Sequence, residues 1–366
     1  MTRSMRRRNS GTHLLALAAG LWLGVTPHPA VAAQAPEWPK VPGAVFALRN
    51  GNPVTPVVAF DAKGRDLMAF NSAARGRGLL GRFHELFCDG GSFVATDAGT
   101  WIGMQVAKSG SFTLEAMLTP AEAPPKTPGV VLAYADDKGE DAALLHDKNG
   151  LSLRLGGSQM ITLFAPDVGK PVHVLIACGK EKWAAYRDGK PSGSGPLAAG
   201  APAWGTRQLV MGAAWSRADP WRGRMEAVAI FPRTLTAAEA AAQAVASKTL
   251  RAGRKPATTL RFKGTLVRQA KTSDLKEIQP YTRSLTAAEY KVDKVLAGEW
   301  KQPTITVLHW MIMDAKRLPI ADRKSGATVE LGVEPLNEHP QLNDCRRDEI
   351  TEGDLVIDPY YCESEP

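Results

Sequence analysis

Short apolar runs, separated by glycine, proline and Asp-Gly turns, recur along most of this chain. Residues 111–118 alternate between two sides, which is the period of a half-buried strand, with Glu115 expected on the solvent side. Residues 225–231 are a mostly apolar run of β length that stops at Pro232. Many short strands at this spacing predict an all-β fold built as a sandwich.

The sandwich is expected to begin near residue 41, with a strand at 54–60, and to end in a helix that closes near residue 248. Thr236 stands three residues before Glu239, which is a capping box ahead of an Ala-rich stretch. Residues 191–202 are rich in Gly, Pro and Ser and are predicted to form a loop. Residues 249–258 are rich in Lys, Arg and Pro and are predicted to form a linker.

The stretch 205–247 resembles the closing strands of the laminin-G-like, concanavalin A-like lectin and glucanase superfamily. The matching phrases are a Gly after Trp221-Arg222, a strand, the turn Arg-Thr-Leu-Thr at 233–236, and Glu239. Residues 111–116 and 183–189 match its central strand and its aromatic strand with an Asp-Gly turn. The resemblance covers residues 41–248 and implies a jelly-roll β-sandwich. That family contains carbohydrate binders, protein binders and glycosidase relatives, so the fold alone does not name a function.

Residues 259–366 are predicted to form a second, smaller β domain. Residues 290–296 fit a strand by alternation, although Thr286 and Glu289 would equally well cap a helix; the strand is favoured because β-like runs follow. The phrase Tyr-x-Val-x-x-Val-Leu-x-Gly is similar to small closed barrels of the OB or netrin-like type, in which closure removes exposed strand edges. In the pair His309-Trp310 we expect a core Trp and an outward His.

The N-terminus is predicted to be a signal peptide spanning residues 1–32. Arginines at 3 and 6–8 precede an apolar run at 14–25 that is too short to cross a bilayer, and residues 30–32 fit a cleavage site. The chain is therefore expected to be exported to the periplasm or outside the cell, by the Sec or twin-arginine route, without a transmembrane segment in the mature chain. The alternative is an uncleaved anchor.

Charge is unevenly distributed along the chain. The formal net charge of +8 falls to +4 once the four arginines of the signal are removed. Residues 33–256 carry 26 basic and 19 acidic side chains, whereas residues 257–366 carry 15 and 18. This asymmetry either biases the choice of partner or is ordinary solvated charge. No Lys/Arg run with interleaved aromatics is present, so nucleic-acid binding is excluded.

Four cysteines in an exported chain predict disulfides. Cys345 and Cys362 share the C-terminal tail and are expected to pair. Cys88 and Cys178 lie in β-like runs of the first domain and pair if their strands are neighbours; otherwise they are two free buried thiols.

A Trp-bearing loop is the strongest candidate for a ligand site. Trp215 and Trp221 bracket Arg217 and Asp219, so an aromatic face for a sugar ring lies beside groups that bond hydroxyls. The alternatives are that Trp221 packs on the sandwich edge and that Arg217 and Asp219 simply pair with each other.

An acidic turn containing Asp136, Asp137, Glu140 and Asp141 is a possible calcium site, since calcium takes six to eight oxygen ligands. Its spacing matches no calcium-loop pattern, so a solvated turn is the alternative. No other cofactor is expected.

These features favour an exported, non-catalytic binding protein that recognises carbohydrate or a cell-envelope protein. A carbohydrate-active enzyme is the first alternative, and Glu115 would then be indispensable. The glycosidase relatives carry paired carboxylates in a Glu-x-Asp-x-x-Glu pattern, which this chain lacks. No Gly-x-Ser-x-Gly or His-Glu-x-x-His motif occurs. A structural or inhibitory interaction module, suggested by the netrin-like resemblance, is the second alternative.

Overall fold

The computed structural model describes residues 43–49, 78–95, 98–121, 127–197, 204–343, 345–350 and 360–362. The chain divides into Met1–Gln34 and a compact unit, Ala35–Pro366, and every described residue belongs to the second. The predicted signal peptide and the strand predicted at 54–60 lie outside the described residues. Within them, neither helix combines the length and hydropathy needed to cross a bilayer.

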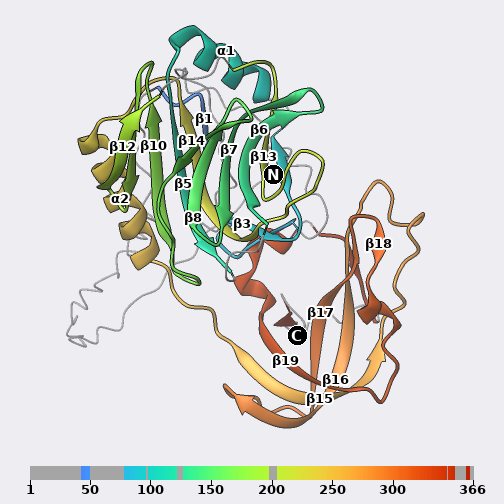
Figure 1. Cartoon of the computed structure of the whole chain (residues 1–366). Helices are drawn as coiled ribbons and strands as arrows, with labels where there is room; N and C mark the ends of the chain where they lie inside the picture. The colour runs from blue at the N-terminus through green and yellow to red at the C-terminus, as the bar shows by residue number, and fades with distance from the viewer. Residues whose placement is uncertain are drawn as a thin grey trace, which may run out of the picture. The chain divides into compact units, whose positions relative to one another are not determined.

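Among the described residues, the first sheet has eight strands in the order β12-β11-β10-β5-β14-β3-β2, with β1 also paired to β14 (Figure 1). All of its pairings are antiparallel. Its strands are β1 (Phe46–Arg49), β2 (Gly78–Leu80), β3 (Leu86–Asp89), β5 (Phe112–Pro120), β10 (Val172–Cys178), β11 (Lys182–Arg187), β12 (Lys190–Pro196) and β14 (Arg222–Phe231).

The second sheet, in the part of the chain that the structure describes, has six strands in the order β4-β13-β6-β7-β8-β9. They are β4 (Phe93–Ala95), β6 (Gly129–Asp136), β7 (Gly139–Asp147), β8 (Gly150–Leu155), β9 (Gln159–Thr162) and β13 (Gln208–Met211). Phe112 of the first sheet and Tyr134 of the second are both completely buried in one shared core. The predicted all-β sandwich is therefore confirmed.

Helix α2 (Ala237–Ala252) covers the outer face of the first sheet. It begins at the predicted capping box, in which the Thr236 hydroxyl accepts a hydrogen bond from the Glu239 backbone N–H and the Glu239 carboxylate accepts one from the Thr236 N–H. It continues to Ala252, inside the segment predicted as a linker. Ala240, Gln243 and Ser247 are buried, and Figure 1 shows the helix beside β10 and β12.

The position of α2 overturns the expectation that Glu115 faces solvent. Glu115 is completely buried, because it lies between Leu175 and Ala229 of the neighbouring strands, and these pack in one apolar cluster with Ala240 of the helix. Its Oε1 lies 3.0 Å from Nε2 of His173, which is also buried. Strand alternation separates two sides of a sheet, but it does not say which side is covered.

Helix α1 (Gly99–Ser109) was not predicted. It places Ile102 and Val106 in the sandwich core and ends at Gly110, whose φ of 64° forms a left-handed cap bonded to Val106. A Cβ added at Gly103 would lie 2.1 Å from the carbonyl oxygen of Gly205. Helix α1 therefore packs directly against the backbone at Gly205, and this close approach is possible because glycine has no side chain.

Two further sequence expectations are corrected in the first sheet. Part of the predicted loop at 191–202 forms β12, an edge strand, where Pro191 is tolerated because one side needs no ladder bond. Cys88 on β3 and Cys178 on β10 are separated by β14 and β5, so about three strand spacings, or about 14 Å, lie between them.

None of the four cysteines forms a disulfide. Cys88 and Cys178 are buried thiols in the sandwich core, and burial raises the pKa of each, that of Cys178 to about 12. The predicted bridge between Cys345 and Cys362 is also absent. Cys362 lies in the core of the C-terminal barrel, whereas Cys345 packs against a different apolar cluster.

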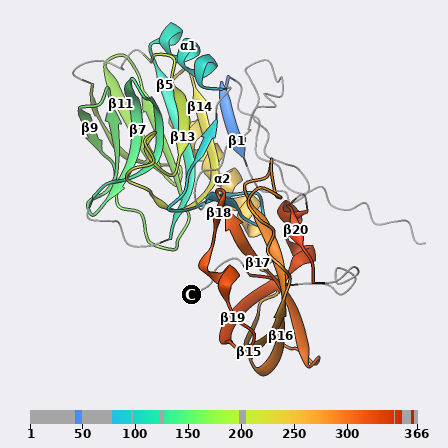
Figure 2. The same cartoon turned by 90° about the vertical axis from the view of Figure 1, so that its right-hand side faces the viewer.

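The C-terminal part is a barrel in which five strands pair as a closed cycle, β15-β16-β17-β21-β19 and back to β15. Only the β17–β21 pairing within this cycle is parallel. Figure 2 shows its long strands curving together. The barrel strands are β15 (Leu260–Gln269), β16 (Ser284–Ala297), β17 (Thr304–Met313), β19 (Thr328–Pro335) and β21 (Tyr360–Tyr361).

The strand prediction for residues 290–296 is correct, since they lie within β16. Short elements complete this part: β18 (Lys316–Arg317), β20 (Arg347–Asp348) and 3₁₀ turns at Pro319–Asp322, Leu336–Glu338 and Pro340–Leu342. Phe262, Tyr290 and Val307 are among the buried interior residues.

The expected orientation of His309 and Trp310 is reversed. His309 is buried against Tyr290, with Nε2 3.1 Å from the Tyr290 hydroxyl, and burial, helped by the charge of Arg323, lowers its pKa to about 3. Trp310 belongs to an apolar cluster outside the barrel interior, and its indole N–H donates to the Tyr361 hydroxyl at 3.0 Å.

Candidate functional site

The candidate loop runs from the end of β13 to the start of β14, residues 212–221. Gly212 has a φ of 95°, and a Cβ there would lie 2.4 Å from Sγ of Cys88, so this turn requires glycine. The Gly212 N–H donates to Val131 at 2.8 Å, and the Trp221 N–H donates to the Gly212 carbonyl at 2.8 Å. Both ends of the loop are therefore fixed to the sandwich.

One hydrogen bond within the loop and one to β6 hold the middle of the loop. Arg217 and Asp219 adopt left-handed backbone conformations, with φ of 68° and 51°. Such conformations cost non-glycine residues about 1 kcal/mol or more each. The Arg217 N–H donates to Ala214 at 2.9 Å, and the Asp219 carbonyl accepts from Val130 at 2.9 Å. This second hydrogen bond fixes the loop to the beginning of β6.

Trp221 does not belong to an accessible ligand surface. Its side chain is 1% exposed and lies in the core between the sheets, and its ring lies over Gly223, where a Cβ would be 2.4 Å away. The prediction of Trp221 as a ligand contact is therefore corrected: it packs in the core between the sheets, deeper than the sandwich edge of the alternative.

Trp215 lies on the opposite side of the loop and is half-buried. It packs against an apolar cluster on the outer face of the second sheet, made of Val130, Ala133, Ala135, Ala143 and Leu145. This packing orients the indole while leaving part of it accessible to solvent.

Arg154 adds a hydrogen-bonding group that the sequence analysis missed. Its Nε and Nη2 donate to the two carboxylate oxygens of Glu140 at 2.7 and 2.8 Å. The hydrogen bond to Glu140 raises the pKa of Arg154, and the charge of Asp219 adds to the effect. Arg154 therefore lies within electrostatic reach of the loop. Ser152, on the same side of β8, has a buried Oγ with no hydrogen-bond partner in the described part of the chain.

Arg217 and Asp219 have separate partners. Nη1 of Arg217 lies 3.4 Å from Oδ2 of Asp314, and this ion pair links the loop to the turn after β17. The negative charge of Asp219 instead acts on Arg154, whose pKa it raises. The side chains of Arg217 and Asp219 are both exposed. Trp215, Arg217 and Asp219 thus all reach solvent from one loop, and Arg154, paired with Glu140, lies within electrostatic reach of Asp219.

The acidic turn predicted as a calcium site is an arginine-binding turn. Arg207 pairs with both Asp136 and Asp141, and Asp141 also accepts from the Gly205 N–H at 2.6 Å. Asp137 stays exposed at the turn. In the described ranges no group of three or more His, Cys, Asp or Glu side chains is arranged to hold a metal ion. The calcium prediction is therefore corrected, because a cation already occupies these carboxylates.

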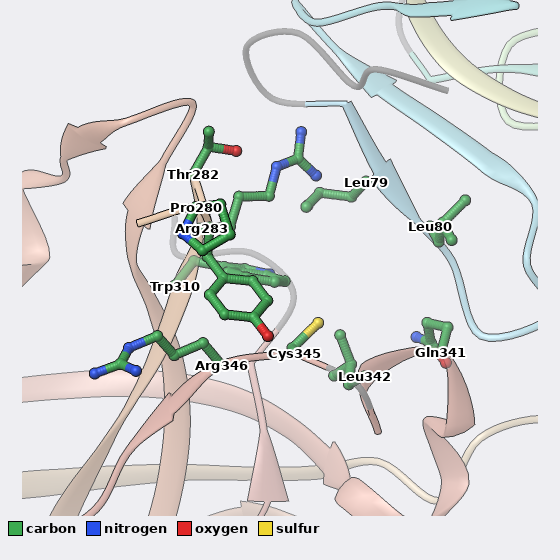
Figure 3. Close-up of a pocket in the computed structure, with 11 residues that line it drawn as sticks. Leu79, Leu80, Pro280, Thr282, Arg283, Trp310, Gln341, Leu342, Cys345 and Arg346 are labelled. Atoms are coloured by element: carbon green, nitrogen blue, oxygen red, sulfur yellow. The ribbon is translucent and has the colours of Figure 1, made fainter. Parts of the chain in front are cut away.

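A separate cavity of about 390 Å³ lies where β2 meets the barrel (Figure 3). Arg283, Trp310, Cys345 and Arg346 are among its lining residues. No local sequence pattern predicts this cavity, because its walls come from segments far apart along the chain.

Two antiparallel sheets around one core, with a helix closing the outer face, define this part of the molecule as a concanavalin A-like sandwich. Residues 90–241 match the family model of the concanavalin A-like lectin/glucanases superfamily. The match does not extend to the barrel. The comparison with curated proteins gave no match.

Several solved structures are similar at low identity. Trypanosoma rangeli sialidase in complex with the inhibitor DANA is 17% identical, with a TM-score of 0.42 over 58% of this chain and 34% of its own. Domain 4 of AbnA, a GH43 extracellular arabinanase from Geobacillus stearothermophilus, in complex with arabinotriose, is 12% identical. The match has a TM-score of 0.40 and covers 56% of this chain and 100% of that domain. A SAP-like pentraxin from Limulus polyphemus is 15% identical, with a TM-score of 0.31 over 36% of this chain and 68% of its own. The chain spans about a third of the sialidase, and similarity at this level does not transfer function.

Proposed function

We propose that this is an exported, non-catalytic binding protein that recognises carbohydrate through the loop at residues 212–221 and the adjoining strands. The observation that carries this proposal is the half-buried Trp215 beside exposed Arg217 and Asp219. An indole held by packing on one side offers its other parts to the apolar face of a sugar ring. The neighbouring charged groups supply donors and acceptors for hydroxyls.

The superfamily of residues 90–241 supports a carbohydrate partner, since its description joins lectins and glucanases. Binding is favoured over hydrolysis because of where Glu115 lies. A glycosidase acting through two carboxylates needs both beside the scissile bond, about 5 to 9.5 Å apart. Glu115 is instead buried beneath α2 with His173 as its partner.

The proposal is tested with the mature protein on a glycan array and against isolated cell-envelope polysaccharide. Trp215→Ala is expected to weaken binding at least about tenfold, because stacking and its buried area are lost together. Trp183→Ala is the matched control, since Trp183 is a half-buried tryptophan on the other sheet. Folded wild-type protein that binds no glycan, or equal losses in both variants, would contradict the proposal; capture of an envelope protein instead would favour a protein partner.

A further inference from the structure

The hairpin that joins β17 to β18 turns through two left-handed residues. Met313 pairs with Lys316, so the turn contains only two residues. These are Asp314 and Ala315, with φ of 52° and 54°. Turns of this kind favour Asn-Gly or Asp-Gly, because the left-handed region is strained for most residues with a Cβ. Ala315 is nevertheless held there, and its N–H donates to the Thr282 carbonyl at 2.8 Å. The turn is therefore a fixed projection of the barrel.

Asp314 connects this turn to the loop at residues 212–221 of the sandwich. Its Oδ2 lies 3.4 Å from Nη1 of Arg217, which comes 97 positions earlier in the chain. Burial lowers the pKa of Arg283 and the charge of Asp314 opposes this, so Asp314 lies near a second guanidinium group, on the barrel. The Arg217 side chain is 54% exposed, and its other N–H groups have no partner among the residues that the structure describes. One edge of this guanidinium is thus held while the rest faces solvent.

Left-handed backbone is concentrated at this contact. In the described ranges six residues other than glycine have a positive φ, and four of them lie in the loop or in the turn: Arg217, Asp219, Asp314 and Ala315. Such conformations persist only where the surrounding structure enforces them, and they are concentrated at active sites and ligand clamps. An exposed ion pair contributes little to folding stability. The pair therefore has more effect on where the Arg217 guanidinium points than on the stability of the fold.

We propose that Asp314 is a positioning residue of the glycan site, which holds the Arg217 guanidinium in place before a glycan binds. The barrel then shares in recognition through Arg217, although Asp314 does not touch the glycan. An arginine that is already ordered loses less conformational freedom on binding, so its hydrogen bonds to the glycan contribute more to the affinity. This inference rests on the proposed function, since it concerns the same loop.

A double-mutant cycle tests whether Asp314 acts through Arg217. Calorimetry measures the Kd for cellotriose, xylotriose, maltotriose, chitotriose and the strongest oligosaccharide of the glycan array, and the tightest of these is used for every variant. Arg217→Ala is expected to raise this Kd about tenfold, and Asp314→Ala about threefold. The double variant is expected to bind no more weakly than Arg217→Ala, because a positioning residue has no effect once its target is gone. An additive rise of about thirtyfold in the double variant, or an unchanged Kd in Asp314→Ala, overturns the proposal.

Two further variants separate positioning from damage to the turn. Asp314→Asn keeps an oxygen acceptor and a residue type that tolerates the left-handed region, so its Kd is expected to lie between those of the wild type and Asp314→Ala. Glu330→Ala is the matched control, since it removes an exposed carboxylate of the same barrel that pairs with Arg261. An equal rise in Kd for Glu330→Ala and Asp314→Ala overturns the proposal.

The ordering of Arg217 is measured without any glycan. Nitrogen NMR relaxation of its Nε–H group gives the order parameter of the side chain, and the signal is assigned by its loss in Arg217→Ala. In Asp314→Ala the order parameter is expected to fall by about a third or more, into the flexible range. An order parameter of Arg217 that is the same in the wild type and in Asp314→Ala overturns the proposal.

The two proposals fail separately. Wild-type protein that binds no glycan contradicts the proposed function, whatever the order parameter of Arg217. Glycan binding that is lost in Trp215→Ala but unchanged in Asp314→Ala contradicts this inference alone.

Discussion

His173 Nε2 lies 3.0 Å from Glu115 Oε1, and both side chains are enclosed between the first sheet and helix α2. Removing one member of such a pair leaves the other buried without its partner. We expect Glu115→Ala to lower the free energy of unfolding by about 2–3 kcal/mol. Glu115→Gln keeps the shape and a polar contact and should cost less.

Urea unfolding of both variants measures these changes, with exposed Glu181→Ala as the control. Glycan binding should survive Glu115→Gln. A hydrolytic activity that is present in the wild type and abolished in Glu115→Gln would instead favour the enzyme interpretation.

The cap of α2 makes a pH-dependent contribution to stability. Hydrogen bonds from Arg233, and from the Thr236 backbone, lower the pKa of Glu239 to about 2. A carboxylate with a lowered folded-state pKa stabilises the protein above its unfolded value of about 4.3, and this contribution is lost as the pH falls toward 2. Since Glu239 is about one-third exposed, we discount the effect to about 1 kcal/mol.

Glu239→Gln should therefore be less stable than the wild type at pH 7, and the difference should shrink between pH 4.5 and 2.5. Denaturant unfolding at several pH values measures it. A difference that stays constant across this range would show that the carboxylate charge is not responsible.

The fold could be predicted largely because its signals are local. The capping box at Thr236 and Glu239 acts within four residues, and β16 alternates along its own length. Helix α1 was missed because Gly99 and Gly103 are poor helix formers, and their purpose is close approach to backbone elsewhere in the chain. The burial of Glu115 likewise depends on α2, which follows much later in the sequence.

The candidate site could be predicted only in part. The loop was found from its composition, but its composition does not say that Trp221 points inward and Trp215 outward. Arg154 was detectable, since alternation along β8 places it opposite the core residues Leu153 and Leu155. The Arg217–Asp314 pair and the cavity beside β2 join distant segments, and no local pattern contains them.

The ion pairs of Arg207 with two carboxylates of the acidic turn predict that calcium does not stabilise the protein. Asp136 and Asp141 both bind Arg207, and Asp141 is largely buried. The melting temperature should differ by less than about 1 °C between millimolar calcium and EDTA, because a ligand that does not bind the folded state does not shift its stability. Arg207→Ala should destabilise the protein by about 2–3 kcal/mol through the unpaired Asp141. A calcium-dependent rise of several degrees in the wild type would restore the metal-site prediction.

A substitution at Gly103 tests whether direct contact with the backbone at Gly205 holds α1 in place. A methyl group at this position would lie 2.1 Å from the Gly205 carbonyl oxygen and 2.3 Å from the Tyr134 hydroxyl. That hydroxyl donates to Gly99 at 2.6 Å and accepts from the Arg207 N–H at 3.1 Å, so it has little freedom to move. We expect Gly103→Ala to cost about 3 kcal/mol, at the upper end for overpacking, despite the higher helix propensity of alanine. Gly179→Ala is the control, because its nearest atoms would lie 3.5 Å away, at ordinary contact distance. Thermal unfolding of the two variants decides the point: if Gly103→Ala is as stable as Gly179→Ala, α1 is not seated against this loop.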